Sequence, residues 1–128
     1  MRFIKQPFDE FLGLEYERVS ATCVNIRLPL KPMHFNSVGV VHGGIISTLV
    51  DVAMSNLVEA DDRGMQRAVT IDLHTTFLQG ATGEELVAEA STVKHGRTLM
   101  YANCQVYNQT REVVARATGT FFIKEQTK

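Results

Sequence analysis

Hydrophobic and polar positions alternate along most of this chain. In the segment TCVNIRLPL, which begins at Thr22, every second residue from Val24 to Leu30 is apolar. This period of two is typical of a strand with one buried face. The same rule predicts four further strands: AVTIDLHTTFL from Ala68, ELVAEASTVKH from Glu85, TLMYANCQVYN from Thr98 and EVVARATGTFFIK from Glu112. A shorter strand is expected from Leu12 to Tyr16. The short connections QGATGE, GR and NQTR favour antiparallel hairpins.

One stretch departs from this period. GGIISTLVDVAMSNLVEA, from Gly43, places apolar residues at helical spacing and is the only long helix candidate. From Pro32 to Val58 the only fixed charge is Asp51, so we expect protein to surround this helix on most sides. The predicted architecture is α+β: a curved antiparallel sheet wrapped around one central helix, with a short helical turn near Gln6 to Glu10.

Composition narrows the class of protein. A length of 128 residues, 45% of them hydrophobic and 21% charged, predicts one domain over residues 1–128 that needs no disulfide. The formal charge of −1, with no basic run, argues against a nucleic-acid ligand. No apolar segment has the length of a membrane span or the form of a signal peptide, so we expect a cytoplasmic protein. Cys23 and Cys104 are interpreted as small buried hydrophobes.

Asp51 is the first candidate for chemistry. A carboxylate inside an apolar helix must find hydrogen bonds or accept a raised pKa, and such groups serve as acids, bases or nucleophiles. A carboxylate that faces solvent through a gap, or that accepts a structural hydrogen bond, is an equally good interpretation. His34 and His74 lack partners at metal-ligand spacing, so they are interpreted as structural and no metal is expected.

A second group of candidates precedes the helix. Val41-His42-Gly43-Gly44 presents paired glycines at the positive end of a helix, where exposed N–H groups can bind an oxyanion. Asn36 can donate a side-chain N–H to a carbonyl. Taken alone, however, paired glycines more often serve a sharp turn or close packing, a loop Asn usually stabilises a turn, and a lone His is more often structural. His42 and Asp51 are nine residues apart, about 13 Å along a helix, so they cannot converge on one atom. A shared site requires two subunits.

Together these residues resemble the hotdog-fold acyl-CoA thioesterases of the phenylacetic-acid-degradation type, over nearly the whole chain. The resemblance implies that Asn36 and the Gly43 N–H polarise the thioester carbonyl. It further implies that Asp51 of the other subunit is the general base or nucleophile and that His42 lies near the leaving thiolate. Thr70 would orient the attacking water, and no metal or redox cofactor would be needed, since CoA belongs to the substrate.

The resemblance also implies a binding region for CoA. Lys94, His95 and Arg97, around the turn KHGRT, would bind its phosphates, and Gly44 would lie against the substrate. A solvated hairpin tip is the alternative interpretation. A homodimer or homotetramer with shared sites is expected, acting on aryl- or medium-chain acyl groups. Two other classes stay open: a non-catalytic acyl-CoA binding module and a hotdog-fold hydratase or dehydratase.

Overall fold

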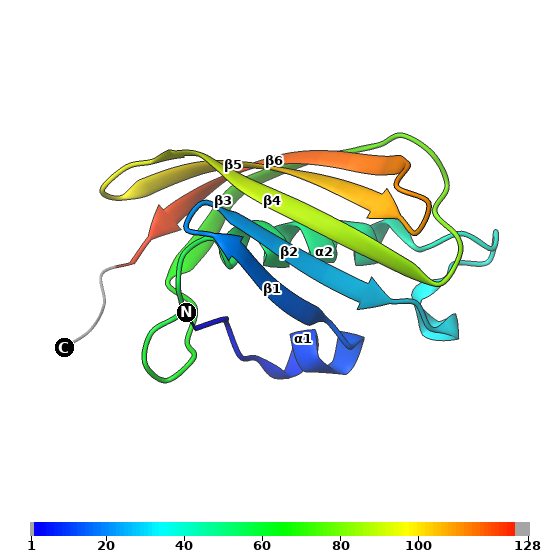
Figure 1. The fold of residues 1–128 in the computed structure, drawn as a ribbon, viewed down its shortest axis with the longest axis horizontal. Coiled ribbons are helices and arrows are strands. Elements are labelled where there is room, and N and C mark those ends of the chain that lie inside the picture. Colours follow the sequence, from blue (N-terminus) through cyan, green and yellow to red (C-terminus); the bar gives the residue numbers. More distant parts are fainter. Residues whose placement is uncertain (1, 125–128) are drawn as a thin grey trace.

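The computed structural model describes residues 2–124, and its main feature is a six-stranded antiparallel sheet curved around one helix (Figure 1). The strands follow one another in the order β1-β2-β4-β5-β6-β3, so that β1 and β3 form the two edges. This arrangement confirms the α+β hotdog fold. The elements are α1 (Pro7–Leu12), β1 (Glu15–Ser20), β2 (Cys23–Pro29), the 3-10 turn η1 (Pro32–His34), α2 (Gly43–Ser55), β3 (Ala68–Phe77), β4 (Glu85–His95), β5 (Leu99–Asn108) and β6 (Val113–Ile123).

Two predicted boundaries were wrong. The first strand begins at Glu15 rather than Leu12, because α1 continues through Leu12 and Gly13 ends it with a φ of 85°. The central helix ends at Ser55, several residues before the predicted end. Asn56 caps it there: its Nδ2 donates to the Val52 carbonyl, and its Oδ1 accepts the Ile4 N–H at 2.8 Å. This second bond ties the N-terminal segment beneath the helix.

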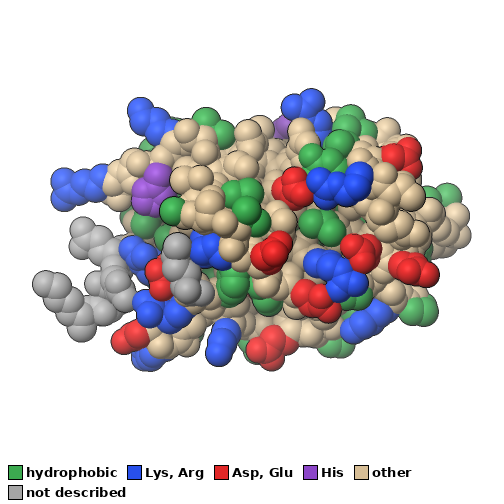
Figure 2. All heavy atoms as spheres, in the orientation of Figure 1, with side chains coloured by type: hydrophobic (Ala, Val, Ile, Leu, Met, Phe, Trp, Pro, Cys, Tyr) green, Lys and Arg blue, Asp and Glu red, His purple; other side chains and the backbone are tan. Residues whose placement is uncertain are grey.

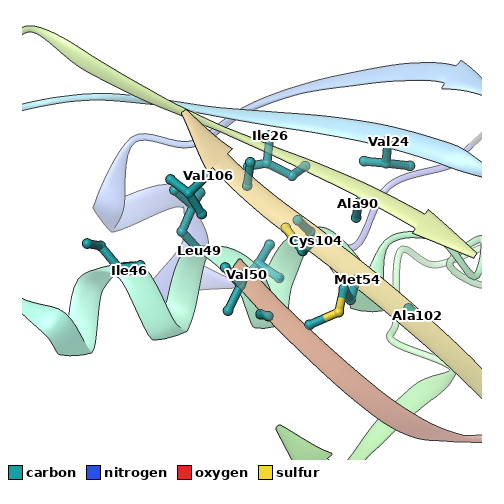
Figure 3. Close-up of a cluster of buried hydrophobic side chains, with 14 of the residues drawn as sticks. Val24, Ile26, Ile46, Leu49, Val50, Met54, Ala90, Ala102, Cys104 and Val106 are labelled. Atoms are coloured by element: carbon teal, nitrogen blue, oxygen red, sulfur yellow. The ribbon is translucent and has the colours of Figure 1, made fainter. Parts of the chain in front are cut away.

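The core between α2 and the sheet is built from large side chains of both layers, with small residues at several strand positions (Figure 3). Leu49, Val50 and Met54 are fully buried on the helix, as are Ile26 and Phe121 on the strands. The small buried residues of β4, β5 and β6 are Ala88, Ala90, Ala102, Ala115, Ala117 and Gly119. A Cβ at Gly119 would lie 2.8 Å from Phe121 Cε1 and 3.2 Å from Met54 Cε. The absence of a side chain there lets the helix approach the sheet closely.

The two edges of the sheet differ in their surface. On the β1 side, Arg27 forms ion pairs with Glu15 and Glu85, and Figure 2 shows acidic and basic side chains side by side over β1 and β2. The β3 edge instead exposes Val69, Ile71 and Phe77 to about half of their full extent, at 46%, 56% and 52%. Within residues 2–124, no helix is long and apolar enough to cross a membrane.

The two cysteines are free thiols, as expected. Cys104 is buried in the sheet, where desolvation raises its pKa, and Cys23 is half-buried. Cys104 therefore behaves as a small apolar side chain, because a thiol that stays protonated is neither a nucleophile nor a metal ligand.

Candidate active site

Asp51 lies on the less buried face of α2 and is held by a neighbour from the edge strand. The Thr70 hydroxyl of β3 donates to Asp51 Oδ1 at 2.6 Å. Asp51 itself is partly exposed, and so are Gly44, Ser47 and Thr48, which lie one and two turns earlier on the same face. The carboxylate is therefore fixed by one strong hydrogen bond while its other side remains open. Such a group can take a proton from water or attack a carbonyl.

A β-bulge explains how Thr70 reaches the helix. The pairing of β3 with β6 shifts between Thr70 and Asp72, so Ile71 is an extra residue on the edge strand. The inward side chains are consequently Ala68 and Thr70 before the bulge and Leu73 and Thr75 after it. Strict alternation predicts Val69, Ile71 and Leu73 on one buried face, and for the first two residues this is wrong. The bulge turns Thr70 towards Asp51 and leaves two apolar side chains outside.

At the other end of α2, His42 forms the N-cap. Its Nδ1 accepts the Gly44 N–H at 2.9 Å, which assigns the proton of the neutral imidazole to Nε2. The Gly44 N–H is thereby occupied, whereas the Gly43 N–H makes no hydrogen bond among residues 2–124. A Cβ at Gly43 would lie 3.4 Å from the Phe77 ring, so this aromatic side chain packs against the Cα of Gly43.

Asn36 has a comparable arrangement in the loop before α2. Its Oδ1 accepts the backbone N–H groups of Val38, Gly39 and Val40 at 3.0, 3.2 and 3.3 Å. These three donors identify the amide oxygen, so Nδ2 is the atom that faces away. Nδ2 makes no hydrogen bond within the described part of the chain. The turn-forming role and the donor role, which the sequence leaves as alternatives, are thus compatible in one side chain.

The structure groups the sequence candidates into two separate sets. Thr70 and Asp51 are in contact, while Asn36, His42 and Gly43 gather at the start of α2. Gly43 and Asp51 lie on the same helix, and eight residues correspond to a rise of about 12 Å. A thioester carbonyl bonded to the first set therefore cannot reach the Asp51 of the same chain.

Of the predicted CoA-binding residues, Lys94 and His95 end β4, and Arg97 lies in the turn between β4 and β5. Lys94, His95 and Arg97 are exposed, and Figure 2 shows basic and histidine side chains at this end of the molecule. The strand register brings the turn near Thr70, because Leu99 pairs with Phe122 and the adjacent Phe121 pairs with Thr70. The turn and the Asp51–Thr70 pair therefore lie at the same end of the sheet.

Sequence reasoning missed a second carboxylate near Asp51. Asp9 of α1 is only 1% exposed and accepts a hydrogen bond from Gln6 Nε2 at 2.8 Å. Burial raises the pKa of Asp9, and the negative charge of Asp51 adds to this shift. The available signal was the spacing of Asp9 and Leu12, which places both on the buried face of α1.

The two remaining histidines have different environments. His34 is fully buried, and His74 is exposed on β3. In residues 2–124, no three His, Cys, Asp or Glu side chains come together in a way that would hold a metal ion.

Comparison with known proteins matches this arrangement to one family. The model of the thioesterase superfamily matches residues 38–115, which include Asn36's loop from Val38 onwards, all of α2 and Thr70. A medium/long-chain acyl-CoA thioesterase from Shigella flexneri is 26% identical over 132 residues, covering 91% of this chain and 85% of the relative. Human acyl-coenzyme A thioesterase 13 is 32% identical over 95 residues, covering 73% of this chain and 67% of the relative.

A solved structure extends the likeness to the fold. A Bacillus halodurans protein, crystallised with CoA, is 30% identical and superposes with a TM-score of 0.81, covering 96% of this chain and 82% of its own. The match to the family model covers more than half of the chain, and the curved sheet around α2 is the fold that these structures share. The chain belongs to the thioesterase superfamily.

Proposed function

We propose that this protein hydrolyses the thioester of an aryl- or medium-chain acyl-CoA, as thioesterases of the phenylacetic-acid-degradation type do, and releases the free acid and CoA. The observation that carries the proposal is the open Asp51 carboxylate, held by Thr70 at 2.6 Å. The unpaired Asn36 Nδ2 and Gly43 N–H groups add the donors that a thioester oxygen requires. Relatives named acyl-CoA thioesterases and a similar structure crystallised with CoA support this substrate class.

The proposed reaction consumes one water molecule. Water attacks the carbonyl carbon while Asp51 accepts its proton, and the negative charge that develops on the carbonyl oxygen is stabilised by Asn36 Nδ2 and the Gly43 N–H. The C–S bond then breaks and CoA leaves as the thiolate, which His42 Nε2–H faces. The proton held by Asp51 is released to solvent, which regenerates the carboxylate. Alternatively Asp51 itself attacks the carbonyl, and water hydrolyses the resulting acyl-enzyme. In both routes Thr70 fixes the direction of the carboxylate.

The site requires two chains in this proposal. Gly43 lies about 12 Å along α2 from Asp51 of the same chain, and Asn36 belongs to the loop before Gly43, so the acceptor of the water proton comes from the partner subunit. The β3 edge supports such a pairing, because within residues 2–124 its outer backbone groups have no neighbouring strand and Val69 and Ile71 are exposed beside them. Antiparallel pairing of two β3 strands would bring two α2 helices side by side. Asp51 of each would then face the start of the other.

Lys94, His95 and Arg97 supply a place for the CoA phosphates. Their turn lies at the Thr70 end of the sheet, so a single extended CoA molecule can contact both regions. Exposed cations bind ground state and transition state alike. We therefore expect Arg97→Ala to raise KM for acyl-CoA and to leave kcat nearly unchanged. The matched measurement uses pantetheine thioesters, which lack the nucleotide and on which the substitution should have no effect.

The decisive experiment assays a panel of aryl- and medium-chain acyl-CoAs for release of free thiol. Turnover would exclude the binding module, and detection of the free acid as the only acyl product would exclude the hydratase or dehydratase. Asp51→Asn should lower kcat at least about a hundredfold with the fold intact, because it removes the base at nearly constant volume. Asp72→Asn changes an exposed carboxylate on β3, the strand that carries Thr70, and is the matched control that should keep wild-type turnover.

Thiol release by none of the acyl-CoAs, from protein that binds CoA, would favour the binding module. Wild-type turnover by Asp51→Asn would instead favour the alternative interpretation, in which Asp51 faces solvent or accepts a structural hydrogen bond.

A further inference from the structure

The loop before α2 is closed at its base by His34 and His42. The His42 N–H donates to the His34 carbonyl at 2.8 Å, and the next pair inward, Phe35 and Val41, forms an isolated antiparallel bridge. The Asn36 N–H then donates to the Val40 carbonyl at 2.8 Å. The loop is therefore a small hairpin. It carries Asn36 near its tip and delivers the chain directly to Gly43.

His34 also connects the base of the hairpin to Lys31, in the segment that follows β2. Its Nδ1 accepts the Lys31 N–H at 2.9 Å, and its own N–H donates to the Lys31 carbonyl at 2.9 Å. The side chain is fully buried, at 0% exposure. The imidazole and the backbone of one residue thus connect Lys31, which follows strand β2, to His42, the N-cap of α2.

The protonation of this imidazole is set by its contacts. Nδ1 accepts a hydrogen bond, so the proton of the neutral form is on Nε2. Burial lowers the pKa of His34, an interaction with the Leu12 backbone opposes this shift, and the charge of Lys31 acts in the same direction as burial. An apolar residue at this position would avoid the desolvation of the imidazole but would leave the Lys31 N–H without its acceptor.

We infer that His34 is a positioning residue for the oxyanion-binding groups: its imidazole, by accepting the Lys31 N–H, fixes the base of the hairpin and with it the separation of Asn36 from Gly43. The inference rests on the proposed function, in which these two residues bind one oxygen. His34 does not touch the substrate, and it acts through the His42 N–H and the Phe35–Val41 bridge. Hydrogen-bond donors stabilise a transition state only when they are held in place beforehand.

The test compares substitutions that differ in where they place an acceptor. In His34→Asn the Oδ1 lies close to the former Nδ1 position and can still accept the Lys31 N–H. In His34→Gln the acceptor extends to the Nε2 position, and His34→Leu has similar bulk and no acceptor. We expect kcat for the best acyl-CoA to fall at least about tenfold in the Gln and Leu variants. KM should stay within about twofold, because the CoA phosphates bind at the β4–β5 turn, while the Asn variant should keep kcat within about threefold.

Asn103→Leu is the matched control, since Asn103 is exposed on β5, away from the β3 edge, and its replacement should leave kcat unchanged. If the Leu variant does not fold, the comparison of Asn with Gln carries the test. Equal kcat values for the Asn and Gln variants, or equal proportional changes in kcat and KM, would overturn the inference.

Amide hydrogen exchange provides a readout that does not depend on activity. The amides of Asn36 and His42 should exchange faster in the Gln and Leu variants than in the wild type or the Asn variant. Exchange at the His95 end of β4, which is opposite to the end that pairs with Pro29, should stay unchanged. Failure of the wild type to release thiol would reject the proposed function, whereas unchanged exchange at Asn36 and His42 would reject the positioning role itself.

Discussion

The two edge strands of the sheet, β1 and β3, differ in length, charge and exposed apolar surface. β1 has six residues, and the side chains of Glu15, Glu17 and Arg18 give it charge along half of its length. β3 has ten residues with a single charge, Asp72, and exposes Val69, Ile71 and Phe77. Short, charged edges resist pairing with another chain, while long apolar edges favour it. The β1 edge is therefore protected against association with another chain, and the β3 edge is suited to it.

The same difference extends to the residues behind each edge. Behind β1 lie the ion pairs of Arg27 and, on α1, the sealed carboxylate of Asp9. Behind β3 lie Thr70 and the open carboxylate of Asp51. The edge suited to pairing is thus also the edge that carries the candidate chemistry. A partner at β3 would complete the proposed site and cover the apolar side chains at the same time.

Mixing two inactive variants should give the largest change, from background to about a quarter of wild-type activity. One parent is Asp51→Asn, and the other carries Asn36→Ala and His42→Ala. Co-refolding at equal concentrations makes about half of the dimers mixed, and each mixed dimer has one intact site of two. Thiol release by the co-refolded mixture measures this recovery, and differentially tagged heterodimers purified from it should have about half of wild-type activity, because one of their two sites is intact. Inactive heterodimers would mean that each site lies within one chain and that the β3 edge has no catalytic role.

A lysine introduced on each edge strand tests whether the β3 edge, and not the β1 edge, mediates association. Ile71 of β3 and Val19 of β1 are almost equally exposed, at 56% and 55%. Ile71→Lys should weaken the dimer at least about a hundredfold, because it places a charge in the apolar contact. Val19→Lys is the matched control and should leave association unchanged. Sedimentation velocity over a dilution series measures both, and equal effects of the two substitutions would remove the distinction between the edges.

Removing the Thr70 hydroxyl should have a smaller effect. Thr70→Val deletes the 2.6 Å bond to Asp51 without changing the shape of the side chain, and hydrogen bonds to charged groups contribute about 1.5–3 kcal/mol. We expect kcat to fall roughly tenfold to a hundredfold. Thr75→Val is the control on the same strand, because the buried Thr75 Oγ1 has no hydrogen-bond partner in the described residues. Equal kcat values for the two variants would show that the bond is only structural.

The smallest expected change concerns Asp9 of α1, whose carboxylate is buried behind β1. Burial raises the pKa of Asp9 in the folded state above the ordinary value of 3.8, which applies to the unfolded chain. At a pH between the unfolded and the folded pKa, the folded state therefore binds more protons than the unfolded state. The free energy of unfolding therefore decreases as pH rises through this window. Asp9→Asn removes that loss and can still accept the Gln6 hydrogen bond. Urea denaturation should find the variant more stable than the wild type at pH 7, with a difference that shrinks towards pH 3.

The strands and the central helix could be predicted from periodicity because each buries one continuous apolar face. β4 runs from Glu85 to His95, as the alternation predicts. The outward turn of Val69 and Ile71 could not be predicted, because it depends on a bulge that one extra residue creates relative to β6. The alternation shows which residues are apolar. It does not show whether such a residue is covered by its own chain or by a partner.

The candidate site was predictable in its residue types and only partly in its geometry. Asp51 is conspicuous as the only charge in its segment, and the spacing from His42 indicates two separate sets. The hydrogen bond from Thr70 joins residues that lie 19 positions apart, and the sequence gives no measure of that contact. Asp9 and His34 were missed as contributors for the same reason: their importance comes from burial beside particular neighbours.

The close approach of α2 to the sheet has a consequence for how this chain can vary in evolution. At Gly119 the strand leaves space that Met54 of the helix and Phe121 fill. A smaller residue in place of a large helix side chain leaves a void, and Leu49→Ala would cost about 2–5 kcal/mol. A larger residue in place of Gly119 overfills the same core. Drift at this contact is therefore constrained in opposite directions on its two sides, so a compensating exchange there would pair a smaller residue at Met54 with a larger one at Gly119.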